Sequence, residues 1–260
     1  MHRWIRTLLA TTLTLTFLAA AARLGWVAQP VSAVPQQPFA AVNPPGGSAT
    51  DAAVQRLQQR LGARPDDPSA AEAYAQLGNL YLQKARETGD PSYYTRADGV
   101  LKRSLELDGD NVAAIVGVGG LHLARHSFAE ALQWGERAVQ LAPASHAAHG
   151  VVGDAAIELG RYQEGMAAVQ IMVDLRPGLS SYSRVSYVRE LVGDQLGAIA
   201  AMESALDAGP PGAEGTNWSR VQLGHLYFAS GDLKSAERQY QTALRLLPNY
   251  APAVAGLGRV

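Results

Sequence analysis

The feature that most constrains this chain is a short pattern that recurs along it. A bulky residue, two free positions, Leu-Gly, two more positions and Tyr occur at Tyr74–Tyr81, and nearly the same arrangement returns at Arg220–Tyr227. Weaker copies keep the spacing and begin at Ile115, His149, Tyr182 and Val254. Recurrence at a fixed spacing indicates one supersecondary unit used several times.

A second pattern follows the first in each unit. It is a small residue, an apolar residue four positions later and another small residue three after that, as in Ala236, Tyr240 and Ala243. Prolines follow it at Pro143, Pro177, Pro210 and Pro248, near a period of about 34 residues. Spacings of four and three place residues on one face of a helix. We therefore expect each unit to be two antiparallel helices, the second of which is closed by its proline.

Composition and turn residues agree with helix pairs. Alanine, leucine and glycine dominate the apolar residues, whereas aromatic residues make up only 7% of the chain, which favours helix over sheet. Gly160 and Gly231 stand between the two patterns, where a helix must end. The first unit is longer and turns at Thr88–Pro91, and Ala213–Thr216 is an insertion between the fourth and fifth units.

These patterns resemble the tetratricopeptide repeat family, in particular its exported bacterial members, over about Asp51–Val260. The resemblance implies an all-α, right-handed superhelical solenoid of antiparallel helix pairs, with a concave groove and a protein-binding role. It divides the body into a capping helix at 51–67 and, at 68–260, five repeats and a truncated sixth. It implies no enzymatic activity, because this scaffold serves many functions.

Residues 1–33 have the features of an export signal. Arg3 and Arg6 precede an apolar run, and Val31-Ser32-Ala33 offers small residues to a signal peptidase. We favour cleavage after Ala33. An uncleaved signal anchor is the alternative, because Leu8–Ala28 has about the ~20 residues that span a bilayer, although Arg23 lies within it. Both interpretations predict an exported body: periplasmic, cell-surface or secreted. Residues 34–50, rich in Pro, Gly and Ala, are predicted to be a disordered linker.

Several kinds of chemistry are disfavoured. Without cysteine there is no disulfide or thiolate site, and a net charge of -1 gives nucleic-acid binding no electrostatic support. No nucleophile elbow, phosphate-binding loop or His-Glu-x-x-His motif occurs. The pairs His122/His126 and His146/His149 lack an accompanying carboxylate motif. We therefore expect no catalytic residues, no metal and no cofactor.

The resemblance assigns the concave groove to set positions of each first helix. The candidates for partner contact are Asp154, Glu158, Arg184, Tyr187, Glu190, Trp218, His225 and Phe228. No lysine falls on that face, so we reject a clamp for a terminal carboxylate. The aromatic residues are candidate peptide anchors; the alternative is that Trp218 and Phe228 pack against the next repeat.

The sequence thus predicts a non-enzymatic scaffold or adaptor that holds a protein or peptide partner. It predicts no nucleic-acid partner, and contact with a membrane only through an uncleaved N-terminal anchor. The alternative is an exported enzyme or envelope-assembly factor whose active portion lies beyond residue 260. The chain stops inside the first helix of a sixth unit, so we expect a fragment whose last helix leaves an apolar flank uncovered at Leu223, Tyr227, Tyr240 and Leu244. The alternative is a complete chain whose open end docks on a partner or on a second copy of itself.

Overall fold

The computed structural model describes residues 48–63 and 65–260. The predicted signal segment, 1–33, and most of the predicted linker lie outside these residues. The described part contains twelve α-helices, one short 3-10 helix and no strand, so the all-α prediction is confirmed. The helices are α2 (Ala49–Ala63), η1 (Pro68–Ala70), α3 (Ala71–Thr88), α4 (Ser92–Leu107), α5 (Val112–Ala124), α6 (Phe128–Leu141), α7 (His146–Glu158), α8 (Tyr162–Leu175), α9 (Leu179–Leu191), α10 (Gln195–Ala208), α11 (Glu214–Ala229), α12 (Leu233–Leu246) and α13 (Ala251–Leu257).

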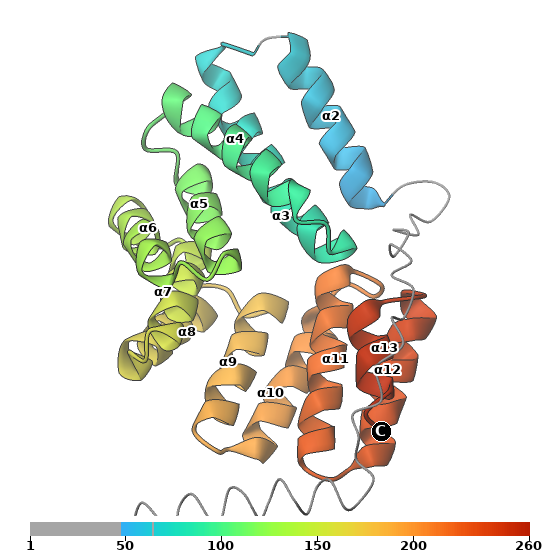
Figure 1. Ribbon diagram of the computed structural model, residues 1–260. Helices are drawn as coiled ribbons and strands as arrows, with labels where there is room; N and C mark the ends of the chain where they lie inside the picture. The colour runs from blue at the N-terminus through green and yellow to red at the C-terminus, as the bar shows by residue number, and fades with distance from the viewer. Residues whose placement is uncertain (1–47, 64) are drawn as a thin grey trace, which may run out of the picture. The chain divides into compact units, whose positions relative to one another are not determined.

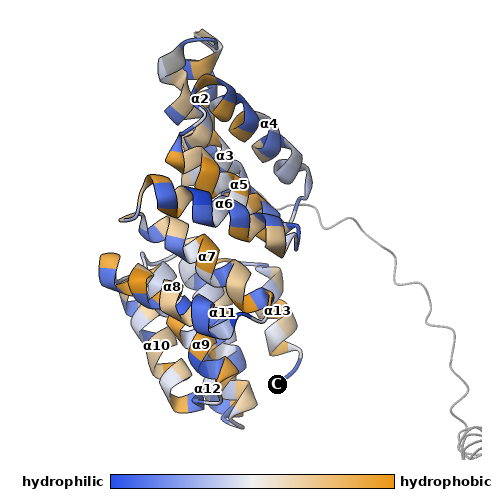
Figure 2. Ribbon diagram, turned by 90° about the vertical axis from the view of Figure 1, so that its left-hand side faces the viewer, coloured by the Kyte–Doolittle hydropathy of each residue, from blue (hydrophilic) through white to orange (hydrophobic). Residues whose placement is uncertain are grey.

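Consecutive helices form antiparallel pairs that follow one another as a solenoid (Figure 1). The pairs are α3/α4, α5/α6, α7/α8, α9/α10 and α11/α12, with α2 before them and α13 after them. Hydrophilic and hydrophobic residues are interleaved along the helices (Figure 2), because each helix buries one stripe against its neighbours and leaves another in water. The first pair has the longer helices that its extra residues predict. Helix α2 begins at Ala49, so residues 49 and 50 of the predicted linker are helical.

Turn glycines and capping side chains set where the helices end. Gly160 and Gly231 have φ values of 77° and 83°, a left-handed conformation that costs a residue with a Cβ about 1–2 kcal/mol. The side chain of Asp232 then accepts a hydrogen bond from Ser235 N at 3.0 Å and caps α12. These local signals explain why the sequence places the turns correctly.

Glycines at the helix crossings leave room for large side chains between repeats. Tyr240 of α12 is fully buried, and its ring occupies the space that a Cβ at Gly224 or Gly256 would need. Gly256 belongs to α13. The expectation that the last helix leaves Tyr240 uncovered is therefore wrong. Helix α13 has only seven residues, but it covers the ring of Tyr240, because Gly256 has no side chain to hold the two helices apart.

The buried apolar residues fall into two groups along the solenoid. The clusters built from α2–α8 contain no residue of α9–α13, and the clusters built from α9–α13 contain none of α2–α8. Hydrogen bonds from Arg184 and Tyr187 of α9 to Asp154 and Glu158 of α7 join the third pair to the fourth. This junction carries several of the residues that the sequence assigns to partner binding.

Candidate partner-binding surface

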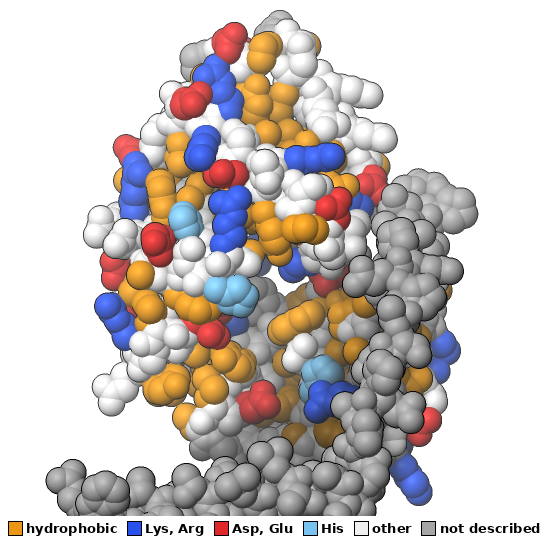
Figure 3. Space-filling view, viewed as in Figure 1, with side chains coloured by type: hydrophobic (Ala, Val, Ile, Leu, Met, Phe, Trp, Pro, Cys, Tyr) orange, Lys and Arg blue, Asp and Glu red, His pale blue; other side chains and the backbone are white. Residues whose placement is uncertain are grey.

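The predicted contact residues lie on three first helices. Helix α7 carries Asp154, half-buried, and Glu158, exposed; α9 carries Arg184, half-buried, with Tyr187 and Glu190 exposed. Helix α11 carries Trp218, exposed, with His225 and Phe228 half-buried. The described face in Figure 3 is hollowed near its centre, with hydrophobic side chains on both sides of the hollow.

The structure brings the residues of α7 and α9 together as bonded pairs. Arg184 donates from Nε and Nη2 to the two carboxylate oxygens of Asp154, at 2.8 and 2.6 Å. Tyr187 donates its hydroxyl to Glu158 at 3.2 Å. Burial, followed by the charge of Glu158, raises the pKa of Tyr187. These charged groups are engaged with each other across the junction, which supports a structural role for them.

The three candidates on α11 have different surroundings. His225 Nδ1 lies 2.8 Å from the hydroxyl of the buried Tyr240, and burial lowers its pKa. Phe228 packs against the apolar cluster of α11–α13, and the guanidinium of Arg259 lies 4.8 Å from the centre of its ring. Trp218, in contrast, is 42% exposed. Packing against the next repeat thus accounts for Phe228 and not for Trp218.

The insertion before the fifth repeat has a structural consequence that the sequence did not reveal. Residues 214–216 are not a loop but the first turn of α11. Glu214 there is buried and accepts a hydrogen bond from the Tyr250 hydroxyl at 3.0 Å. Its other carboxylate oxygen lies 3.4 Å from Gln83 Nε2 and 3.9 Å from Arg86 Nε. The end of α3 therefore meets the start of α11 (Figure 1), and the first repeat contacts the fifth.

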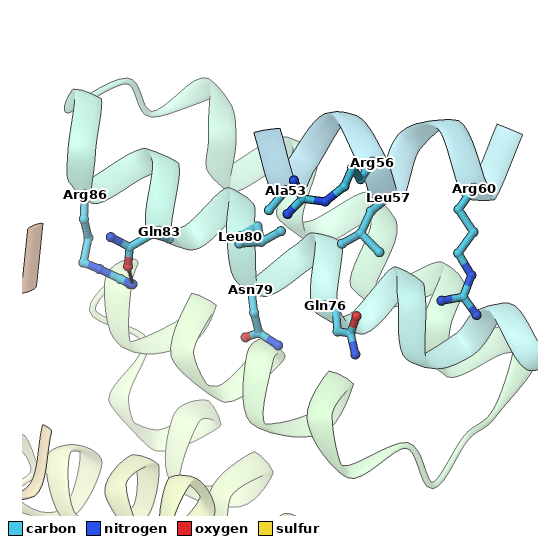
Figure 4. A pocket seen from close by; sticks show the side chains of 9 residues that line it. All are labelled: Ala53, Arg56, Leu57, Arg60, Gln76, Asn79, Leu80, Gln83 and Arg86. Atoms are coloured by element: carbon cyan, nitrogen blue, oxygen red, sulfur yellow. Dashed lines mark hydrogen bonds between the residues drawn. The ribbon is translucent and has the colours of Figure 1, made fainter. Parts of the chain in front are cut away.

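A groove lies between α2 and α3, and the contribution of α2 to it was not predicted from the sequence. It has a volume of about 710 Å³, and Figure 4 shows the side chains around it. It is lined by Ala53, Arg56, Leu57 and Arg60 of α2 and by Gln76, Asn79, Leu80, Gln83 and Arg86 of α3. Arg56 and Arg60 stand four residues apart in the sequence, and this spacing could have indicated a basic stripe on the capping helix.

Both members of the pair His146/His149 have structural partners. His149 Nε2 lies 2.9 Å from the carbonyl oxygen of Pro143, and His146 Nε2 lies 3.1 Å from Arg176 Nη1. Within residues 48–63 and 65–260, no group of three or more His, Cys, Asp or Glu side chains is placed to hold a metal ion. In the same residues, no helix combines the length and the apolar character that crossing a membrane requires.

Comparisons with known proteins agree with this architecture. Family profiles described as tetratricopeptide repeat match residues 92–146 and 219–250. The fold is similar to that of a thermophilic tetratricopeptide repeat protein of Thermus thermophilus, with a TM-score of 0.62, 21% identity, and coverage of 73% of this chain and 98% of that one.

It is also similar to a chain in the Cut9–Hcn1 hetero-tetramer of APC/C, with a TM-score of 0.65, 16% identity, and coverage of 81% of this chain and 39% of that one. No curated protein matches the sequence. The repeated pattern, the stacked helix pairs and the matching family profiles lead to one conclusion: this chain is a tetratricopeptide repeat protein.

Proposed function

We propose that this protein is a non-enzymatic scaffold that holds a protein or peptide partner and acts outside the cytoplasmic membrane. Solenoids of helix pairs present extended surfaces to partners, and the similar Cut9–Hcn1 structure is itself a hetero-tetramer. Asp154 is paired with Arg184, and Glu158 accepts a hydrogen bond from Tyr187. These carboxylates already have partners within the protein, which supports a scaffold over an enzyme.

One observation carries the binding proposal. Tyr187 and Trp218 are 40% and 42% exposed, although they stand on first helices of successive repeats. Large aromatic side chains left in water are typical anchors of protein interfaces, because burying them in a partner releases much apolar surface at little cost in side-chain entropy. We propose these two residues as the primary contacts, with Phe228 supporting them from α11.

The test compares matched aromatic variants of the full chain. Immobilised protein is incubated with an envelope extract, and the bound proteins are identified by mass spectrometry. The double variant Tyr187→Ala/Trp218→Ala is expected to lose the partners, since each true anchor contributes about 2 kcal/mol or more, on the order of a thirtyfold change in affinity.

Tyr162→Ala/Leu196→Ala is the control pair. Both residues are more exposed, at 54% and 81%, and they lie on second helices of the repeats. Equal capture by wild type, control and the Tyr187/Trp218 variant, with all three folded, would exclude these anchors.

The location rests on residues 1–33 and has its own test. Protease added to spheroplasts of expressing cells is expected to digest the repeat body. Size analysis of the untreated protein then distinguishes cleavage after Ala33 from an uncleaved anchor. Complete protection of a full-length chain would contradict export.

A further inference from the structure

We infer that the α2–α3 groove binds an acidic segment of a partner protein in extended conformation. This inference deepens the proposed scaffold function, on which it rests, by giving the partner a chemistry and a second contact region. None of the residues that line the groove belongs to α9 or α11, the helices that carry the aromatic candidates.

All the charged residues that line the groove are positive. Arg56, Arg60 and Arg86 line it, and none of the nine lining residues is Asp or Glu. No hydrogen bond or ion pair joins Arg56 or Arg60 to another described residue. Arg86 donates to Gln83 and lies 3.9 Å from the carboxylate of Glu214. In a chain with a net charge of -1, three arginines around one groove without carboxylates among them form a site complementary to negative charge.

The spacing of the arginines favours an elongated ligand over a single ion. Arg60 and Arg86 stand near opposite ends of the groove, and Arg56 lies between them (Figure 4). The lining residues of α3 run from Gln76 to Arg86, about 15 Å along the helix axis. An extended peptide of about five residues spans this length, so several carboxylates on one segment can each meet a guanidinium.

The other lining residues favour an acidic peptide over other negatively charged polymers. Leu57, Leu80 and Ala53 add apolar surface that suits aliphatic side chains between the acidic ones. No aromatic residue is among the nine that line the groove, so it offers no platform for the stacking that single-stranded nucleic acids use.

The groove is held in shape by contacts between α2 and α3. Lys84, buried in α3, pairs with Asp51 at 2.9 Å, and Gln58 donates to the Tyr81 hydroxyl at 2.9 Å. The arginines themselves are exposed and take no part in these contacts. Their replacement therefore tests binding without loosening the helix pair.

The experiment measures fluorescence anisotropy of a labelled peptide in which Glu and Leu alternate, acetylated and amidated so that it carries no terminal charge. Full-length protein is expected to bind it, with an affinity that falls as salt is added. The same peptide with Gln in place of Glu is expected not to bind. Failure of the Glu peptide to bind overturns the inference.

Two variants with equal changes in net charge separate the groove from general electrostatics. Arg56→Gln/Arg60→Gln is expected to weaken binding roughly tenfold or more, since two charge-assisted contacts are lost. Arg161→Gln/Arg189→Gln removes two exposed arginines that pair only with nearby Glu164 and Asp194, and it is expected to change affinity by less than about twofold. Equal weakening by both variants would overturn the assignment to the groove.

Phosphatidylglycerol vesicles and oligothymidylate serve as competitors. Neither is expected to displace the peptide at matched charge concentration; displacement by either one, through the same two arginines, would reassign the groove to a membrane or nucleic acid and overturn the inference. The scaffold proposal and the groove inference can fail independently of each other. If the acidic peptide does not bind but Tyr187→Ala/Trp218→Ala still abolishes partner capture, only the acidic groove is wrong.

Discussion

Arg184 of α9 donates hydrogen bonds to both carboxylate oxygens of Asp154 of α7, at 2.8 and 2.6 Å. The pair lies where the two groups of apolar clusters meet, between the third and fourth repeats. Both side chains are about one-quarter exposed, at 27% and 28%, so solvent screens the pair only in part. A hydrogen-bonded ion pair thus links the first helices of these two repeats.

We expect Asp154→Ala to lower the free energy of unfolding by about 1–2 kcal/mol, because Arg184 is left half-buried without its partner. The double variant Asp154→Ala/Arg184→Met should recover part of this loss, since it removes both charges. Urea denaturation of Asp154→Ala, Arg184→Met and the double variant, each compared with wild type, measures the coupling. Additive effects would show that the pair is energetically unimportant.

Tyr240 offers a test of the closing role of α13. Tyr240→Ala is expected to cost about 3–5 kcal/mol, since a large buried ring is removed from between Gly224 and Gly256. Tyr240→Phe keeps the ring and loses only the 2.8 Å contact with His225, at a cost of about 1 kcal/mol. Thermal unfolding of both variants gives the comparison, and similar losses for the two would contradict the packing argument.

Two glycine variants should shift stability in opposite directions. Gly231→Ala places a Cβ in a left-handed turn at φ 83° and is expected to destabilise by roughly 1–2 kcal/mol. Gly99→Ala lies within α4 with open space around the new methyl group and should stabilise by about 0.5–1 kcal/mol, because alanine favours helix. Chemical denaturation checks both signs.

The ion pair between Lys84 and Asp51 predicts a dependence of stability on pH. The hydrogen bond from Lys84 lowers the pKa of Asp51. The unfolded carboxyl therefore binds protons more readily than the folded one, so the pair stabilises fully above the unfolded pKa of about 3.9 and is lost as pH falls through the lowered value. The difference in unfolding free energy between wild type and Lys84→Met should shrink between about pH 5 and about pH 2. A constant difference across this range would contradict the assignment.

The sequence by itself determined the helices, their pairing and their turns. A glycine such as Gly160 ends a helix, and small residues such as Ala236 mark where two helices touch. These signals act over a few residues, and each is repeated in successive units, so the pattern is clear without coordinates. The exposure of Trp218 and the burial of Tyr240 were harder to predict from the sequence, because both depend on the neighbouring repeat.

Only the tertiary structure decided which distant residues meet. The contact of Glu214 with Gln83 spans 131 positions in the sequence, and it depends on the small rotation between each repeat and the next, summed over the solenoid. The same holds for the groove, which Arg56 and Arg60 of α2 line together with Asn79 and Gln83 of α3. Periodicity shows which face of a helix is apolar, but the partner of each polar face is set by the packing angles of whole helices.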